Sequence, residues 1–328
     1  MTSLALKVQV ERWPIAGGFT ISRGRKTEAE VITVELSDGW ARGRGECVPY
    51  ARYGESIEGV AATLEAMGPA LARGLEREAL QEAMPAGAAR NALDCAFWDL
   101  AVKRAGRPAY QLARLEEPKP LVTAFTISLG SPEAMAQAAA LAREHALLKV
   151  KLGGEGDLER IAAVRDAAPH CELIIDANEA WSPADLSTKL EACARANVTL
   201  VEQPLPAADD DILAQFPHPV PVCADESVHD VKSLAPLVGK YDAVNIKLDK
   251  AGGLTEALAM ADAAEKLGFE LMVGCMVATS LSMAPAMLVA QRARVVDLDG
   301  ALLLAHDRPH GLLYQGSLVH PSTPALWG

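Results

Sequence analysis

The sequence predicts a closed parallel α/β barrel that follows a smaller α+β unit, and three observations support this prediction. Half of the 328 residues are hydrophobic and 23% are charged, the composition of a globular protein with a large core. After about residue 120, short apolar runs alternate with alanine-rich segments of helical spacing. Eight such runs occur, and eight is the number of parallel strands that closes a barrel.

The N-terminal unit begins with strands and ends with helix. Residues 4–12 and 30–37 alternate apolar and polar side chains, as half-buried antiparallel strands do. The polar segment 22–26 is predicted as the loop between them, and a glycine-rich loop is predicted over residues 43–56. Residues 88–106 carry apolar side chains at helical spacing and end in a glycine, which suits a helix stop.

The barrel is expected over residues 116–304, after an α+β unit of residues 1–115. Its predicted strands are the runs Val122–Leu129, Leu147–Leu152, Glu172–Ala177, Val198–Gln203, Val220–Glu226, Ala243–Leu248, Glu270–Met276 and Val295–Gly300. A doubly wound open sheet is the alternative arrangement of strands that alternate with helices. It lacks support because no G-x-G-x-x-G motif follows any of the runs.

Charge and cysteine content limit the partners and the compartment. The net charge of −12 disfavours nucleic acid and anionic membranes as partners, although a local basic cluster still permits an anionic substrate. Six cysteines without a CxxC pair, and charges such as Lys7 and Arg12 near the start, predict a cytoplasmic protein without a signal peptide. The uncharged stretch Leu271–Ala290 has the length of a membrane span. Glycine, proline and hydroxyl side chains interrupt it, so we expect a buried strand, a loop and a short helix.

Ionisable residues mark the ends of successive predicted strands. They are Lys149 and Lys151 in the second run, Asp176 in the third, Glu202 in the fourth, Asp225 in the fifth, Lys247 in the sixth, and Asp297 and Asp299 in the eighth. From Lys151 to Lys247 the steps are 25, 26, 23 and 22 residues, one strand–helix unit each. Because barrel strands end at one common mouth, these side chains should meet there. A single aspartate at a strand end is often only a helix N-cap, but the whole set predicts an active site.

Three of these side chains predict a metal site. Asp176, Glu202 and Asp225 come from neighbouring strands, and three crowded carboxylates repel one another unless a cation lies between them. A site built from oxygen atoms suits Mg²⁺, with Mn²⁺ as the alternative. No histidine accompanies the three, which argues against zinc.

The two lysines Lys151 and Lys247 lie on the second and sixth predicted strands, opposite one another in an eight-stranded ring. A substrate held between them would present one face of its α-carbon to each lysine. A nearby divalent cation and burial are expected to lower both lysine pKa values, as a general base requires. Two bases on opposite faces predict racemisation or epimerisation; the alternative is that the lysines only neutralise the carboxylates.

Five motifs at these positions resemble the enolase superfamily, in its muconate-lactonising-enzyme subgroup. They are Lys149-Val150-Lys151, Asp176-Ala177-Asn178, Glu202-Gln203-Pro204, Ala224-Asp225-Glu226-Ser227 and Asn245-Ile246-Lys247. Within that subgroup the chain is most similar to the dipeptide epimerases, above all over residues 45–56, 245–254 and 297–300. The similarity extends over nearly the whole chain.

The resemblance implies a modified TIM barrel, (β/α)₇β, closed by an α+β capping domain that the C-terminal segment 305–328 completes. It assigns metal binding to the three carboxylates, acid/base roles to the two opposed lysines, and contact with the substrate carboxylate to Lys149. The implied reaction is Mg²⁺-dependent epimerisation of a dipeptide at its C-terminal residue, by proton transfer through an enediolate. N-acylamino acid racemase, o-succinylbenzoate synthase and cycloisomerase are the alternative activities in the subgroup.

A charge argument favours a dipeptide of the Ala-Glu type found in peptidoglycan. Asp297 and Asp299, one residue apart on a strand, point the same way and would suit the free ammonium group of the substrate. The basic segment around Arg23 would suit a distal carboxylate, although a solvated loop is the alternative. Thr126, near the end of the first barrel strand, is a further candidate for a hydrogen bond to substrate.

Two other classes of function remain open at this point. A lyase of the same superfamily would keep the lysines and the metal and would remove water from its substrate. A non-catalytic protein on this fold would be expected to lack a metal ligand or a lysine, and none is missing. The expected partners are a small-molecule dipeptide and, in a homo-oligomer, further copies of the chain.

Overall fold

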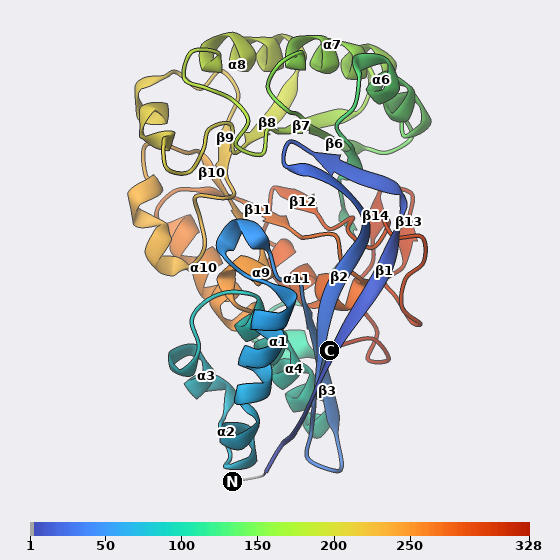
Figure 1. The fold of residues 1–328 in the computed structure, drawn as a ribbon, viewed down its shortest axis with the longest axis vertical. Helices are drawn as coiled ribbons and strands as arrows, with labels where there is room; N and C mark the ends of the chain where they lie inside the picture. The colour runs from blue at the N-terminus through green and yellow to red at the C-terminus, as the bar shows by residue number, and fades with distance from the viewer. Residues whose placement is uncertain (1–2) are drawn as a thin grey trace.

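The computed structural model describes residues 3–328 and shows a capping unit beside a barrel (Figure 1). The cap contains an antiparallel sheet in the order β1 (Ala5–Ile21), β2 (Gly24–Ser37) and β3 (Arg42–Cys47). Its helices are α1 (Ile57–Ala66), α2 (Gly68–Ala72), α3 (Arg77–Ala83), α4 (Ala88–Ala105) and α5 (Ala109–Leu112). Apolar side chains of the sheet and of α1–α4 form a core of their own.

The β1–β2 hairpin is longer than the sequence suggests. Both predicted strands are confirmed, but the segment 22–26 is not an open loop, because Ile21 pairs with Gly24 across a two-residue turn. The long hairpin reaches the barrel, where the Ser22 hydroxyl donates to the Asn178 carbonyl oxygen at 3.1 Å. Arg23 is thereby carried from the cap to the mouth of the barrel.

The predicted loop over residues 43–56 is wrong in its first part, since β3 occupies Arg42–Cys47. Its glycines serve close packing against α4. A Cβ atom on Gly43 would lie 2.2 Å from the Ala96 carbonyl oxygen, and one on Gly45 would lie 2.1 Å from that of Ala92. A larger residue at either position would therefore push the helix away from the sheet.

The barrel prediction is confirmed by a sheet in the order β12-β11-β10-β9-β8-β7-β6-β5. Its strands are β5 (Phe125–Ile127), β6 (Leu147–Lys151), β7 (Glu172–Asp176), β8 (Val198–Glu202), β9 (Val222–Ala224), β10 (Ala243–Ile246), β11 (Glu270–Gly274) and β12 (Val295–Asp297). A hydrogen bond of 2.8 Å from the Ala124 N–H to the Val296 carbonyl oxygen joins the first strand to the last. No helix follows β12 within the described residues, in agreement with the (β/α)₇β arrangement.

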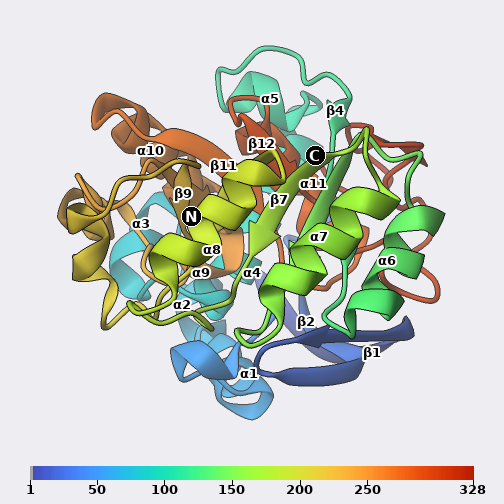
Figure 2. The same cartoon turned by 90° about the horizontal axis from the view of Figure 1, so that it is seen from above.

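Helices and short 3₁₀ turns connect the strands on the outside of the barrel. The helices are α6 (Pro132–Leu141), α7 (Asp157–Ala167), α8 (Leu186–Arg195), α9 (Leu248–Ala251), α10 (Leu254–Lys266) and α11 (Ser280–Ala290). Figure 2 shows α6, α7 and α8 side by side over the strands that they connect. The uncharged stretch from residue 271 forms most of β11, a loop and α11, as expected, and no helix within residues 3–328 is long and apolar enough to cross a membrane.

The C-terminal segment contacts both parts of the molecule. Its strands β13 (Tyr314–Gln315) and β14 (Leu318–Val319) extend a small sheet that begins with β4 (Leu121–Val122). Farther along, the Trp327 indole N–H donates to the Cys95 carbonyl oxygen of α4 at 3.0 Å. The segment therefore packs on the cap as well as on the barrel, while the domain boundaries at residues 115 and 304 remain predictions.

Candidate active site

The inner face of the barrel carries an apolar layer beneath a polar one. The apolar layer takes one side chain from each strand or the residue before it: Ala124, Leu147, Ile174, Leu200, Cys223, Ala243, Met272 and Val295. Side chains alternate along a strand, so the next inward-facing positions lie two and four residues farther on. These positions include Thr126, Lys149, Lys151, Asp176, Glu202, Asp225, Asn245, Lys247, Asp297 and Asp299. Strand alternation therefore brings the predicted residues together.

A cavity of about 750 Å³ lies between the polar layer and the cap. Its barrel wall includes Thr126, Lys151, Asp225, Glu226, Lys247, Asp297 and Asp299, and its cap wall includes Arg23, Tyr50 and Tyr53. Of the remaining predicted residues, Lys149, Asp176 and Glu202 are almost fully buried beneath this cavity. The cavity is thus enclosed by residues from both parts of the chain.

Lysine side chains bind each of the three predicted metal ligands. Lys151 Nζ lies 2.6 Å from Asp176 Oδ2, and Lys247 Nζ lies 2.6 Å from Asp225 Oδ2. Lys149 Nζ lies 2.6 Å from Glu202 Oε2, in a geometry that makes no hydrogen bond, and 3.2 Å from Asp176 Oδ2. Because ammonium groups lie among the carboxylates, no three His, Cys, Asp or Glu side chains within residues 3–328 form a ready-made metal site.

The second oxygen of each carboxylate is held by another group. The Asn178 N–H donates to Asp176 Oδ1 at 2.9 Å, and the Asn245 side-chain amide donates to Glu202 Oε1 at 2.7 Å. Asp225 Oδ1 pairs with the buried Lys250 ammonium at 2.5 Å. One oxygen of each carboxylate is fixed in this way, while the other faces the lysines. A cation placed among the three would thus find oriented oxygen ligands.

Sequence reasoning gave no role to Asn245 or Lys250. Asn245 could have been found from its position two residues before Lys247, on the same face of β10. Lys250 lies in the short helix α9, and the strand pattern gives no signal for it.

The buried cluster has an excess of negative charge. Six carboxylates (Asp176, Glu202, Asp225, Glu226, Asp297 and Asp299) stand against four lysines (Lys149, Lys151, Lys247 and Lys250) and Arg23, which pairs with Glu226. Burial and the neighbouring Asp176 raise the pKa of Glu202 to about 7, and burial and Asp297 raise the pKa of Asp299 to about 7. Asp297 Oδ1 is also buried without a hydrogen-bond donor. A cation among these carboxylates would offset the excess, so the residues present fit a metal.

The expected lowering of the lysine pKa values is not what the structure shows for Lys247. Burial alone would lower its pKa, but Asp225 and Glu202 outweigh burial and hold that pKa well above its ordinary value. The direct ion pair between Lys247 and Asp225 opposes the effect of burial, and the strand pattern does not reveal this pair. A cation that competes for the same carboxylate oxygen would weaken this pair.

Asp297 and Asp299 both border the cavity, but only Asp297 already has a cationic partner in the described chain. Asp297 Oδ2 accepts a hydrogen bond from Lys149 Nζ at 2.7 Å. Asp299 Oδ2 instead accepts one from the backbone N–H of Thr126 at 2.7 Å and makes no ion pair with a residue of the described chain. Asp299 is therefore the stronger candidate to bind a cationic group of a ligand.

Arg23 reaches the cavity from the hairpin tip, but its guanidinium already forms an ion pair with a carboxylate of the chain. Its Nη2 lies 2.8 Å from Glu226 Oε1 and 3.2 Å from the Tyr50 hydroxyl. The second oxygen of Glu226 is buried without a hydrogen-bond donor, and sequence reasoning had passed over this residue beside Asp225. Arg25 also borders the cavity and donates to the Gly17 carbonyl oxygen at 3.2 Å. A ligand carboxylate at Arg23 would share the guanidinium with Glu226.

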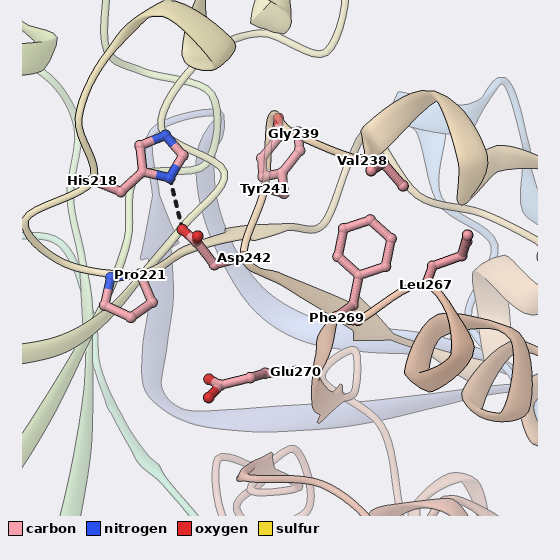
Figure 3. Close-up of a pocket in the computed structure, with 10 residues that line it drawn as sticks. His218, Pro221, Val238, Gly239, Tyr241, Asp242, Leu267, Phe269 and Glu270 are labelled. Atoms are coloured by element: carbon pink, nitrogen blue, oxygen red, sulfur yellow. Dashed lines mark hydrogen bonds and ion pairs between the residues drawn. The ribbon is translucent and has the colours of Figure 1, made fainter.

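A second cavity, of about 470 Å³, lies at the opposite end of β9, β10 and β11 (Figure 3). His218 Nδ1 there pairs with Asp242 Oδ2 at 2.7 Å, which raises the pKa of His218. His218 lies in the loop before β9. No lysine borders this cavity among the described residues, so it lacks the acid/base groups of the first.

Comparison with protein-family models covers most of the chain. Residues 3–113 match the model described as "Mandelate racemase / muconate lactonizing enzyme, N-terminal domain". Residues 133–315 match the model described as "Enolase C-terminal domain-like". The two matches coincide broadly with the cap and the barrel.

Two curated relatives are equally similar in sequence. An L-Ala-D/L-Glu epimerase from Escherichia coli (strain K12) is 45% identical over 317 residues, 96% of this chain and 99% of the relative. An N-acetyl-D-glutamate racemase from a Pseudoalteromonas species is 45% identical over 300 residues, 91% of this chain and 95% of the relative. The names of these relatives differ in whether the substrate carries a free amino group.

Solved structures share the whole fold. One is an enolase family member from Agrobacterium tumefaciens with homology to dipeptide epimerases, with bound sodium and L-Ala-L-Glu. It is 54% identical, with a TM-score of 0.98, and the match covers 99% of this chain and 100% of the other. A dipeptide epimerase from Enterococcus faecalis, complexed with Mg and L-Leu-L-Tyr, is 30% identical, with a TM-score of 0.90 and 98% coverage of each chain.

Proposed function

The chain belongs to the mandelate racemase/muconate lactonizing enzyme family of the enolase superfamily, and on that basis we propose that it epimerises Ala-Glu-type dipeptides at the C-terminal residue. The observation that carries the proposal is the placement of Lys151 and Lys247. Lys151 ends β6 and Lys247 directly follows β10, the second and sixth of eight barrel strands, and both border the cavity. The names of the E. coli relative and of the Agrobacterium structure support the substrate class.

The two lysines would exchange the α-proton from opposite faces. The neutral lysine on one side removes the proton, and the protonated lysine on the other side delivers its own proton to the opposite face of the same carbon. The first lysine then holds a proton and the second lacks one, so exchange with water restores the pair. The reaction is a 1,1-proton transfer that inverts the configuration without a redox step.

Asp176, Glu202 and Asp225 would hold the divalent cation, which we propose is Mg²⁺, with Mn²⁺ as the alternative. When bound, the cation stabilises the negative charge that develops on the substrate carboxylate as the α-proton leaves. Lys149, buried between Glu202 and Asp297, would add a fixed positive charge beneath that carboxylate.

The remaining cavity residues would recognise the two ends of the dipeptide. We assign the ammonium group to Asp299, with Asp297 beside it, and the side-chain carboxylate to Arg23, which would share its charge with Glu226. Thr126 borders the same part of the cavity as Asp299 and would position the peptide group. All six cysteines are free, five of them buried, which supports a reducing compartment such as the cytoplasm.

Incubation with L-Ala-L-Glu and Mg²⁺ in ²H₂O tests the proposed function. We expect deuterium to replace the α-proton of the glutamate residue, and the L,D epimer to accumulate until the two epimers reach equilibrium. Proton NMR follows the exchange and polarimetry follows the inversion. Loss of water from the substrate, or exchange without inversion, would instead indicate a lyase or another reaction of the superfamily.

The Pseudoalteromonas relative makes N-acylamino acid racemisation the second candidate function, and N-acetylation of the substrate separates the two. Acetylation of L-Ala-L-Glu removes the cation that Asp299 requires. An unpaired buried charge costs about 3 kcal/mol or more, so kcat/KM should fall at least about a hundredfold. Initial rates with the free and acetylated dipeptides measure this difference.

The Asp299→Asn variant is the control for this comparison. It should lose activity with the free dipeptide and show a much smaller difference between the two substrates, because the charge that discriminates them is gone. Equal rates of the natural enzyme on both substrates would contradict the ammonium assignment and would favour racemisation of N-acylamino acids.

A further inference from the structure

A buried polar network lies behind the carboxylates and joins the ends of two barrel strands. Its centre is Gln203, a fully buried residue that directly follows Glu202 at the end of β8. The side-chain oxygen of Gln203 accepts hydrogen bonds from the backbone N–H groups of Asp225, at 2.8 Å, and Ser227, at 3.1 Å. Gln203 therefore connects the chain beside one proposed metal ligand to the backbone of another.

The amino side of the Gln203 amide is held as firmly as its oxygen. Nε2 lies 2.8 Å from the Ser227 hydroxyl and 2.9 Å from the Tyr241 hydroxyl. Both hydroxyl groups donate to Asp210 Oδ2, and Lys240 Nζ pairs with Asp210 Oδ1 at 2.6 Å. Because acceptors surround the nitrogen and N–H donors face the oxygen, this network sets the orientation of the amide.

The backbone at Gln203 has an uncommon conformation. Its φ angle is 35°, in the left-handed region that non-glycine residues adopt rarely and only where the surroundings enforce it. The backbone N–H of Gln203 donates to the Cys223 carbonyl oxygen of β9 at 2.8 Å. The main chain of Gln203 thus binds β9, and its side chain binds the segment that directly follows β9.

We propose that Gln203 is a positioning residue that sets the separation of Glu202 and Asp225, so that both carboxylates serve one divalent cation. The inference rests on the proposed metal site and extends it to a residue that touches neither cation nor substrate. Loss of the amide oxygen would leave two buried N–H groups without an acceptor and release the backbone at Asp225. Mg²⁺ requires near-ideal octahedral geometry, so a small shift of one ligand lowers its affinity.

Isothermal titration with Mg²⁺ alone, together with thermal unfolding, tests this role. Gln203→Met removes the amide at nearly constant volume, and Gln203→Asn shortens it by one methylene group while it tolerates the left-handed backbone. We expect either variant to weaken Mg²⁺ affinity at least about tenfold, the usual loss for a group that orients a metal ligand. Gln203→Glu keeps an acceptor oxygen of the same reach but places its second oxygen among the acceptors around Nε2, so it should lower the unfolding temperature while it loses less Mg²⁺ affinity than Gln203→Met.

Tyr241→Phe is the matched control, because it removes a hydroxyl that bonds the nitrogen of the Gln203 amide and leaves in place the bonds from the Asp225 and Ser227 N–H groups to the amide oxygen (Figure 3 shows Tyr241). It should lower the unfolding temperature but change Mg²⁺ affinity less than about twofold. If Gln203→Met does not fold, the Mg²⁺ affinity of Gln203→Asn provides the test of the positioning role. A Gln203 variant that is less stable yet binds Mg²⁺ normally would overturn the positioning role alone. A natural protein that binds no Mg²⁺ would overturn the proposed metal site, and this inference with it.

Discussion

Replacement of either Lys151 or Lys247 by alanine is expected to abolish interconversion of the two epimers, with a loss of roughly 10⁴-fold, the upper range for an acid/base group. Each variant should still exchange the α-proton of one epimer, the one whose proton faces the remaining lysine. The two variants should therefore show opposite preferences when pure L-Ala-L-Glu and L-Ala-D-Glu are incubated separately in ²H₂O. Proton NMR of the glutamate α-position measures both exchange and inversion.

The structure indicates that these variants keep the barrel intact. In Lys151→Ala, Asp176 keeps its contact with Lys149, and in Lys247→Ala, Asp225 keeps its pair with Lys250. Unfolding temperature and Mg²⁺ affinity near the natural values would confirm this point. The two-base assignment would be wrong if either variant interconverted both epimers at nearly the natural rate, or if both variants exchanged the same epimer.

Much of the fold could be predicted because barrel strands and their helices repeat a local pattern. The eight apolar runs correspond to β5–β12, and the alternation of side chains along them explains why Asp176, Glu202 and Asp225 share one mouth. The strand at Arg42–Cys47 escaped prediction for a physical reason. Gly43 and Gly45, which usually signal a loop, are needed there for the close approach of α4. Glycine can serve either a loop or the close approach of two elements, and only the three-dimensional contact distinguishes the two roles.

The final strand lacks a following helix, which the resemblance implied and the local pattern did not show. Residues 301–328 contain three prolines and three glycines, which oppose a long helix. The segment instead forms β13 and β14 and then packs on α4. The absence of a helix is harder to predict than its presence, because a repeating pattern of strands and helices does not indicate where the repeat stops.

The ion pairs and hydrogen bonds between side chains of the candidate active site were its least predictable feature. The sequence placed charges at strand ends but could not show that Lys149 lies against Asp297, or that Arg23 meets Glu226, because each pair joins distant segments. The role of Gln203 could not be predicted, since it depends on the backbone that follows the next strand. Residue positions follow from the strand repeat, whereas contacts between side chains depend on how the strands are staggered around the barrel.

Removal of divalent metal is expected to abolish the activity, and added Mg²⁺ should restore it. Chelation followed by titration with Mg²⁺, with epimerisation followed by polarimetry, measures the effect. The structure also indicates which of the three proposed metal ligands is suited to mutation. Asp225 is an unsuitable choice because it pairs with the buried Lys247 and Lys250, so Asp225→Asn would leave buried ammonium groups with fewer partners and destabilise the barrel.

Glu202→Gln is the better variant, because Lys149 retains its contacts with Asp176 and Asp297 when the charge of Glu202 is lost. As a proposed direct ligand, Glu202 should contribute at least as much as a group that orients one, so Mg²⁺ affinity should fall about a hundredfold or more. Asp299→Asn is the matched control: it removes an equally buried carboxylate from the same cluster, and it should raise the KM for the dipeptide while Mg²⁺ affinity changes little. Full activity after chelation, or equal losses of Mg²⁺ affinity in the two variants, would show that the three strand-end carboxylates do not form the metal site.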